Sequence, residues 1–467
     1  MLWIALHFPS LSLEVFSRGM ADPFPLAVFE RQRNRTRVVA CNEAALACGV
    51  RSGMAASAAQ ALATSLVVRV RDEAAERESL DGIAAWAAQF TPAVSPLPPD
   101  GLLLEVESCL RLHRGLNYLL RLIRAGLDEI GYVSNLSVAP TPHAAWLLSL
   151  AGNEVVISSP ERLEGELELL PVKLLDQPQE IVAGLEMIGA YTLGDCMRLP
   201  RAGMVRRFGS ALLDELDRAL GRQPDPRVFY NPPPSFASKL QLPAQVNEAE
   251  GLLFAARRLL PEMQGYLSLR QAGIQEFELV CCHEDVVDTV IRLGFVKPTR
   301  ALDRMVLLLR ETLARTQLRA SVHSIVLKAT HILPLSGVNA DLFDKGNEAE
   351  DPVLLERLRI RLGKEAVFGV IPAADHRPER AWKRCQAGEG SGNSAKLRRP
   401  LWLLPDPVRC EQSRLVLQSG PERIASGWWD GQDVARDYYV ARNLGGSRLW
   451  VYYEPGSNAW FVHGLFA

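Results

Sequence analysis

The sequence predicts a folded protein of mixed α/β class that is divided into several domains. The chain has 467 residues, and at roughly 100–200 residues per domain this length predicts two to four domains. Hydrophobic residues make up 48% of the chain and charged residues 23%, as in typical globular proteins. Strand-length apolar runs alternate with amphipathic helical segments as far as residue 159. These observations exclude a single small module, a disordered chain and a coiled-coil rod.

The first third of the chain predicts alternating strands and helices. Pro9 ends the first apolar run, and the turn pair Asp100-Gly101 precedes a later one. The expected elements are strand 2–8, helix 12–18, strand 38–40, alanine-rich helices 43–48 and 55–63, strand 102–106, helix 116–130 and strand 135–138.

The middle third predicts a helical domain and then a second α/β domain. Short helices with glycine-containing turns cover residues 164–222, and the proline run at 232–234 forms a stiff boundary. After it we expect strand 235–246, helix 248–269, strands 273–282 and 287–296, helix 301–316 and strand 321–332. The order βαββαβ predicts a sheet with helices on one face.

The last third predicts a helix, a linker and a small β module. A leucine stripe follows Asp351-Pro352, and residues 387–394 are rich in Gly and Ser. Aromatic residues concentrate between 428 and 466 in alternating runs separated by turns, which predicts an antiparallel meander. We expect these aromatic side chains to form its core and not a platform that stacks bases.

Charge and cysteine usage limit the classes of partner. Lys and Arg number 52 against 54 Asp and Glu, so any nucleic-acid contact must come from local basic patches. The eight cysteines form no C-x-x-C pair and have no His at zinc-ligand spacing, so we expect reduced thiols and no metal site. The sequence shows neither a signal peptide nor a membrane-length apolar run, so we expect a cytoplasmic protein without membrane contact.

The order of the elements resembles that of a Y-family (translesion) DNA polymerase over about residues 1–335. The most specific piece spans residues 38–62, around Gly49-Val50-Arg51-Ser52-Gly53-Met54, and resembles the fingers segment of that family. The resemblance implies a right-hand fold with these domains: palm 1–18 and 75–163, fingers 19–74, helical thumb 164–230, and little finger 231–335. A clamp-motif tail, helix and linker (336–399) and a β-rich module (400–467) extend beyond it.

The family's catalytic positions have lost most of their acids. Polymerases hold two Mg²⁺ ions about 4 Å apart on carboxylates. At the positions that match these ligands the chain has Ala5, His7, Asp100 and Gly101, so one acid remains. The fingers Tyr and Arg that bind the triphosphate fall on Glu43 and Leu46. We therefore expect no two-metal site, no cofactor and no catalysis, with Asp100 as a turn residue and His7 as a strand-end histidine.

Further segments resemble the catalytically degenerate Y-family homologues of bacterial mutagenesis cassettes. They are residues 2–9, 193–209, 420–439 and 463–466. This resemblance implies a role in the SOS response and damage-induced mutagenesis. The implied partners are a sliding clamp, an error-prone DnaE-type polymerase and a RecA-like protein of the ImuA type.

One short motif and two basic patches predict where partners bind. The pentapeptide Asn339-Ala340-Asp341-Leu342-Phe343 resembles the clamp-binding motif Gln-x-Asp/Ser-Leu-Phe, although Phe343 can also pack back on the little finger. Sequence-independent binding of primer-template DNA is expected at thumb arginines near helix starts and at little-finger cations, namely Arg201, Arg206, Arg207, Lys239, Arg292 and Lys297.

These observations favour a non-catalytic scaffold over two alternatives. The first is an active translesion polymerase in which Asp100, Glu105 or Glu107, and Glu14 form an unusual metal site. The second is a DNA-binding repair adaptor that works without a clamp. Primer extension distinguishes the first alternative, and replacement of Leu342 and Phe343 distinguishes the second.

Overall fold

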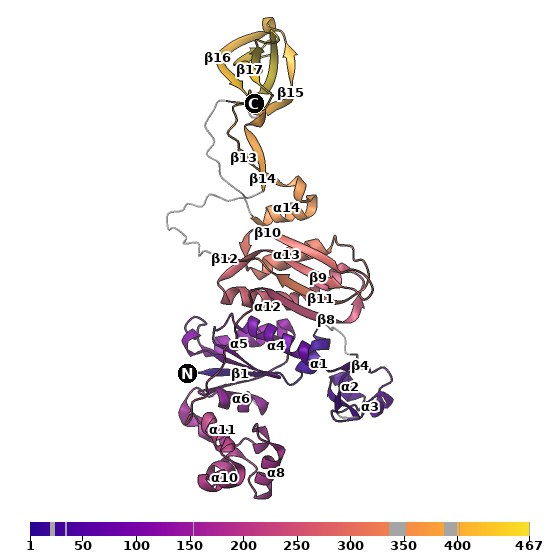
Figure 1. The fold of residues 1–467 in the computed structure, drawn as a ribbon, viewed down its shortest axis with the longest axis vertical. Coiled ribbons are helices and arrows are strands. Elements are labelled where there is room, and N and C mark those ends of the chain that lie inside the picture. Colours follow the sequence, from indigo (N-terminus) through magenta and orange to yellow (C-terminus); the bar gives the residue numbers. More distant parts are fainter. Residues whose placement is uncertain are drawn as a thin grey trace. The chain divides into compact units, whose positions relative to one another are not determined.

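The computed structural model confirms a mixed α/β protein with a β-rich C-terminal extension (Figure 1). It describes residues 1–18, 24–32, 35–152, 154–335, 352–386, 399–400 and 402–466. The chain forms two compact units, Met1–Lys345 and Gly346–Ala467. Within the described residues, no helix is both long and apolar enough to cross a membrane.

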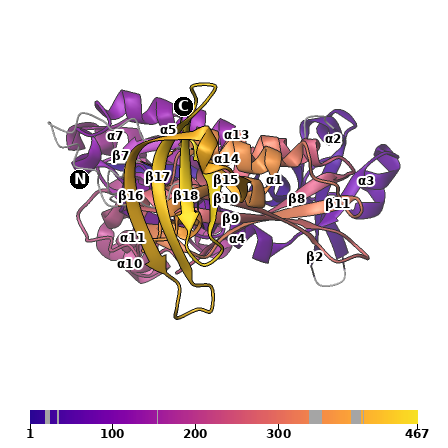
Figure 2. The same ribbon diagram turned by 90° about the horizontal axis from the view of Figure 1, so that it is seen from above.

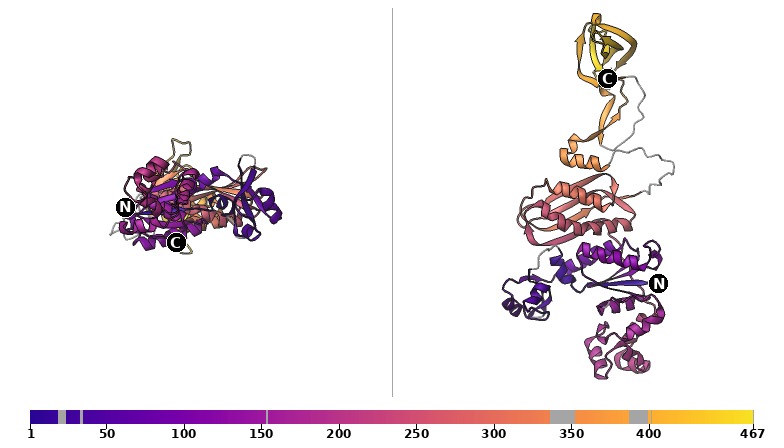
Figure 3. Two further views of the ribbon diagram at one scale, coloured as in Figure 1. Left: turned by 90° about the horizontal axis from the view of Figure 1, so that it is seen from below. Right: turned by 180° about the vertical axis from the view of Figure 1, so that it is seen from behind.

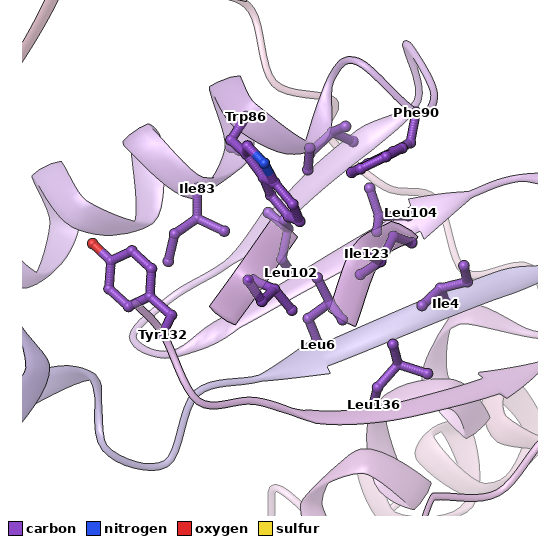
Figure 4. Packing of buried hydrophobic residues seen from close by; sticks show 14 of the residues in the cluster. Ile4, Leu6, Ile83, Trp86, Phe90, Leu102, Leu104, Ile123, Tyr132 and Leu136 are labelled. Atoms are coloured by element: carbon purple, nitrogen blue, oxygen red, sulfur yellow. The ribbon is translucent and has the colours of Figure 1, made fainter. Parts of the chain in front are cut away.

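The palm is built on a four-stranded antiparallel sheet in the order β5-β6-β1-β7. Its strands are β5 (Val94–Leu97), β6 (Gly101–Glu105), β1 (Trp3–His7) and β7 (Asn135–Ala139). Ile4 and Leu6 face the helices α4 (Glu73–Ala87) and α5 (Leu116–Ile130), as Figure 4 shows. Trp3 and Ala5 face the other side, where α6 (Pro142–Leu150) packs. The central strand is therefore covered on both faces.

The fingers subdomain has a small core of its own and lies beside the palm (Figure 3). A three-stranded sheet in the order β3-β2-β4 packs against two short helices. The elements are β2 (Leu26–Gln32), β3 (Arg35–Cys41), α2 (Glu43–Ala47), α3 (Ala56–Leu62) and β4 (Val67–Val70). The helix α1 (Leu11–Ser17) connects the palm strand β1 to this subdomain.

The thumb is helical, and its apolar residues join the core on the Ala5 face of the palm sheet. Its helices are α7 (Leu163–Glu168), α8 (Gln179–Met187), α9 (Leu193–Arg198), α10 (Arg201–Phe208) and α11 (Ala211–Ala219). The buried Glu215 of α11 accepts hydrogen bonds from Gln177 Nε2 at 2.7 Å and from the Asp176 N–H at 2.9 Å, and lies 3.2 Å from Nε2 of palm residue His143. This carboxylate therefore joins the thumb to the palm.

The little finger has the predicted βαββαβ order. Its elements are β8 (Phe236–Val246), α12 (Leu252–Leu269), β9 (Ala272–Cys282), β10 (Thr289–Thr299), α13 (Leu302–Leu313) and β11 (Val322–Ala329), and the short β12 (Ile332–Pro334) pairs with β9 in addition. The antiparallel sheet runs β10-β9-β11-β8. In β10, buried Ile291 and Leu293 alternate with exposed Val290 and Arg292, so one face is packed and the other meets solvent.

The second unit ends in the predicted antiparallel meander. Within the described residues, the unit begins with α14 (Pro352–Leu362), which is followed by the hairpin of β13 (Phe368–Pro372) and β14 (Trp382–Gln386). The five-stranded sheet consists of β15 (Trp402–Cys410), β16 (Leu415–Ser426), β17 (Val434–Asn443), β18 (Arg448–Glu454) and β19 (Ala459–Leu465), and Figure 2 shows β16, β17 and β18 side by side. Tyr438, Trp450 and Tyr452 form its core, whereas Trp428 and Trp429 are exposed. The aromatic residues therefore serve partly as core, as expected.

Candidate functional site

Three of the four positions that we matched to the family's metal ligands, His7, Asp100 and Gly101, meet where β1 ends and β6 begins, which we call the palm edge, whereas Ala5 lies further inside β1. His7 ends β1 and pairs with Gly101 of β6 on one side and with Asn135 of β7 on the other. The Asp100 carbonyl accepts a hydrogen bond from the Phe8 N–H at 2.8 Å. Ala5 lies two residues before His7 on the same face of the strand and is fully buried.

His7 is held by polar and aromatic neighbours. Its Nε2 lies 3.6 Å from Oδ2 of Asp100, and its Nδ1 lies 3.4 Å from Nδ2 of Asn135. The indole of Trp146 on α6 meets the imidazole edge-on, with ring centroids 5.5 Å apart. The imidazole is therefore packed in place as a strand-end histidine.

Trp146 also fills the space that a side chain at position 101 would need. A Cβ atom on Gly101 would lie 2.5 Å from Cζ3 of Trp146 and 2.9 Å from the carbonyl oxygen of Leu97. Both distances are too short for a real contact, so a carboxylate at position 101 is incompatible with this packing. A carboxylate at position 5 would replace a buried methyl group inside the apolar core.

The other acids of the alternative metal site have structural roles of their own, and Glu105 lies at the opposite end of β6 from Gly101, where it pairs with Trp3. The carboxylate of Glu105 accepts a hydrogen bond from the Glu107 N–H at 3.2 Å. Glu14 is buried on α1, where Oε1 accepts a hydrogen bond from the Val133 N–H at 2.8 Å and burial raises the pKa of the carboxyl to about 7. Across the part of the chain that the structure describes, no group of three or more His, Cys, Asp or Glu residues is placed to hold a metal ion.

The triphosphate side of the fingers also lacks the family's groups. Asn42 caps α2 by accepting a hydrogen bond from the Ala45 N–H at 3.0 Å, and Glu43 is the first residue of the helix. Leu46 is exposed. The neighbouring cation, Arg51, donates to the backbone carbonyls of Leu46 at 2.7 Å and of Val50 at 3.0 Å. Under the predicted match, which nothing in the structure tests, Glu43 and Leu46 of α2 stand where the family has a Tyr and an Arg.

The thumb arginines occupy both ends of α10, and this corrects the expectation that all of them lie near helix starts. Arg201 is the first residue of α10, and its guanidinium binds both carboxylate oxygens of Asp217, at 3.0 and 2.5 Å. Arg206 and Arg207 lie in the last turn of α10 and are exposed. The free N–H groups of the α10 N-terminus therefore cannot act together with Arg206 and Arg207.

The little-finger cations lie on exposed strand positions. Lys239 projects from β8 opposite Val326, and Arg292 lies on the solvent face of β10. Arg292 Nε donates to Oε1 of Glu278 at 2.8 Å, so an acid accompanies this cation. Lys297 is exposed beyond the register shift that follows Gly294.

Two further segments that we expect to bind partners are residues 339–343 and 375–379. The pentapeptide 339–343 lies outside the described residues. In the second unit, the run Asp375-His376-Arg377-Pro378-Glu379 is a candidate for partner binding from its sequence, and its Arg377 is almost fully buried and bonds to Asp375 and Asp430 at 2.8 and 2.7 Å. This arginine connects the loop of the β13-β14 hairpin to the turn that carries Trp428 and Trp429.

Comparison with known proteins gives consistent likenesses. Residues 12–150 match the model of the impB/mucB/samB family. The protein ImuB of Caulobacter vibrioides is 28% identical over 456 residues, which cover 90% of this chain and 100% of that protein. DNA polymerase IV of Shewanella oneidensis is 28% identical over 202 residues, which cover 42% of this chain and 56% of the polymerase.

Among solved structures, a Y-family DNA polymerase chimera of Dbh and Dpo4 covers 72% of this chain and 100% of its own, with a TM-score of 0.41 and 18% identity. DinB from Sulfolobus solfataricus has the same coverage and identity, with a TM-score of 0.40. The likeness in sequence thus extends over nearly the whole chain for ImuB and over residues 12–150 for the impB/mucB/samB family.

Proposed function

We propose that this chain is a non-catalytic Y-family polymerase homologue that works as a cytoplasmic scaffold in damage-induced mutagenesis. In this role it binds primer-template DNA and the sliding clamp, and it recruits an error-prone DnaE-type polymerase and a RecA-like ImuA-type protein. The observation that carries the proposal is the packing of Trp146 against Gly101, which leaves no room for an acidic side chain at position 101. The likeness to ImuB supports the same role.

Electrostatic repulsion favours the loss of catalysis. Two divalent ions beside a triphosphate need several oxygen ligands that carry negative charge. At the palm edge Asp100 is the one acid among the four matching positions, and His7 beside it supplies a nitrogen ligand that Mg²⁺ does not favour. Extension of a primer by the purified chain is therefore the activity that would refute the proposal.

An active polymerase with a rebuilt site is the second candidate, and the positions of its acids argue against it. Glu14 would have to leave a buried site in which it accepts a backbone hydrogen bond. Glu105 would have to give up the hydrogen bond that its carboxylate accepts from the Glu107 N–H. Each acid would give up a satisfied contact before it reached a metal ion.

Support for DNA binding comes from the exposed cations. Arg206 and Arg207 are neighbours on the thumb surface, and Lys239 and Lys297 are exposed on the little finger. Such side chains neutralise phosphates without reading bases. The net charge of -2 means that this binding depends on these local patches.

Clamp recruitment is tested with the pentapeptide. We expect the Leu342→Ala, Phe343→Ala double variant to lose clamp binding in surface plasmon resonance, because the apolar pair would fill a cleft on the clamp. The matched control replaces Leu354 and Leu362, which are exposed on α14. If the double variant binds the clamp as tightly as the wild-type chain, the pentapeptide is not the clamp-binding motif; a wild-type chain that does not bind the clamp would favour the clamp-independent adaptor.

A further inference from the structure

The palm helices and the little finger are packed together as closely as two halves of one core. The helix α12 packs on α4 and α5, and the strand β8 packs on α1. A Cβ atom on Gly265 of α12 would lie 2.4 Å from the carbonyl oxygen of Ala85 and 2.6 Å from Cα of Trp86. The backbones of α4 and α12 thus approach to a distance that only glycine permits at this position.

A buried ion pair crosses this interface. Arg18 Nη1 lies 2.8 Å from Oε1 of Glu262, and the two side chains are 3% and 1% exposed. Arg18 also donates to the hydroxyl of Tyr132, whose ring centroid lies 4.5 Å from the guanidinium carbon. The hydroxyl of Ser238 donates to the second oxygen of Glu262. Arg18 follows α1 and Tyr132 follows α5, whereas Glu262 belongs to α12 and Ser238 to β8.

The ion pair fixes one register between the palm and the little finger. Two buried charges add little net stability compared with an apolar pair, because both lose their hydration. A shift of α12 along α4 would nevertheless leave Arg18 and Glu262 unpaired in an apolar site, which is strongly unfavourable. Glu262 also faces Gly82 of α4, where a Cβ atom would lie 2.7 Å from Oε2. The close contact at Gly82 and the Arg18–Glu262 pair therefore favour the same position of α12 along α4.

The segment that connects the thumb to the little finger is tied to both sides of the interface at its end. The Tyr230 N–H donates to the carbonyl of Val94 in the palm strand β5 at 2.7 Å. The hydroxyl of Tyr266 and Nη2 of Arg270 both donate to the carbonyl of Pro233 at 2.7 Å. By contrast, residues 221–224 at the start of the segment are exposed.

We propose that the little finger of this chain is a fixed extension of the palm, held in one position by the Arg18–Glu262 pair and the glycine contact between α4 and α12. The palm and the little finger then move as one body, and the exposed cations of the little finger keep one placement relative to the palm. This inference concerns the free protein and does not depend on the proposed scaffold function.

The test cuts the connecting segment and asks whether the two parts stay together. A protease site inserted after Gln223 of the full chain gives two fragments upon cleavage. We expect the fragments of the wild-type sequence to co-elute in gel filtration at about 1 µM, because separation would expose the packed faces of α4 and α12 and break the buried Arg18–Glu262 pair. Wild-type fragments that elute separately would overturn the proposal.

Variants of the cut chain test the ion pair itself. Glu262→Gln leaves the buried Arg18 charge without its anionic partner, so we expect its fragments to separate. The matched control is Glu154→Gln, which removes an exposed pair with Arg124 at 3.0 Å and is expected to co-elute like the wild type. If the Glu262→Gln fragments co-elute as completely as those of the control, the ion pair does not hold the little finger on the palm.

A milder variant covers the case in which Glu262→Gln does not fold. Ser238→Ala removes one hydrogen bond to Glu262 and leaves both charges in place. We expect it to raise the dissociation constant of the fragments by about ten-fold, as for the loss of a hydrogen bond to a charged group. An unchanged dissociation constant would contradict the proposal.

Discussion

Gly101 and Trp146 form the contact that most constrains the palm edge at the scale of single residues. The alignment of positions could be predicted from the sequence, because Asp100-Gly101 precedes a clear apolar strand and His7 ends another. The filling of the site could not be predicted, because it requires α6 to fold over the sheet and place Trp146 against Gly101.

The first prediction concerns this contact. We expect Gly101→Ala to lower the free energy of unfolding by about 1–3 kcal/mol, because the added Cβ would overlap Trp146 and the Leu97 carbonyl. Gly165→Ala on α7 is the control, since its Cβ would meet open space, and it is expected to be neutral or slightly stabilising. Urea unfolding measures both. Equal effects of the two changes would contradict the account.

The second prediction concerns Glu14, whose pKa rises from 4.5 to about 7 on burial. The folded state holds this proton more tightly than the unfolded state, so its contribution is complete below pH 4.5 and is lost as pH rises through 7. We expect a loss of up to about 3 kcal/mol across this window.

Glu14→Gln should remove this pH dependence and leave the other groups titrating as before. Urea unfolding of both proteins from pH 5 to 8 measures the difference between them, which should shift in favour of the variant as pH rises. Parallel curves for the wild type and the variant would contradict the burial argument.

At the scale of elements, the sequence was most informative where one face of an element is apolar. The bounds of α5 were predicted to the residue, and all six elements of the βαββαβ domain were found. The helix α4 was not predicted, because its first half is charged while Gly82 to Ala87 are all buried, which leaves no single apolar stripe. The hairpin β13-β14 was also missed, since its alternating exposure depends on few apolar residues.

The third prediction belongs to the helix α10. We expect Arg206→Ala with Arg207→Ala to weaken binding of primer-template DNA and to reduce the slope of log K against log salt by about 2, one phosphate contact for each arginine. Fluorescence anisotropy across a salt series measures the slope. Arg124→Ala, on the palm helix α5, is the control for removal of an exposed arginine. An unchanged slope in the double variant would place the DNA contact elsewhere.

At the scale of the whole molecule, buried carboxylates join the palm to its neighbouring domains. Glu215 connects the thumb through His143, Gln177 and Asp176, and Glu262 connects the little finger through Arg18. Neither connection could be predicted from the sequence, because each joins residues far apart along the chain. In the second unit, the ion pair between Arg377 and Asp430 was equally hidden, because Asp430 lies far along the chain from the hairpin loop.

Primer extension decides whether this chain binds DNA without extending it. The purified full chain is incubated with primer-template DNA, the four nucleotides and Mg²⁺ or Mn²⁺, beside the Asp100→Ala variant. We predict no extension by either protein, while anisotropy in the same buffer shows that primer-template DNA is bound. Extension by the wild-type chain that disappears in Asp100→Ala would contradict the account and show a working metal site at the palm edge.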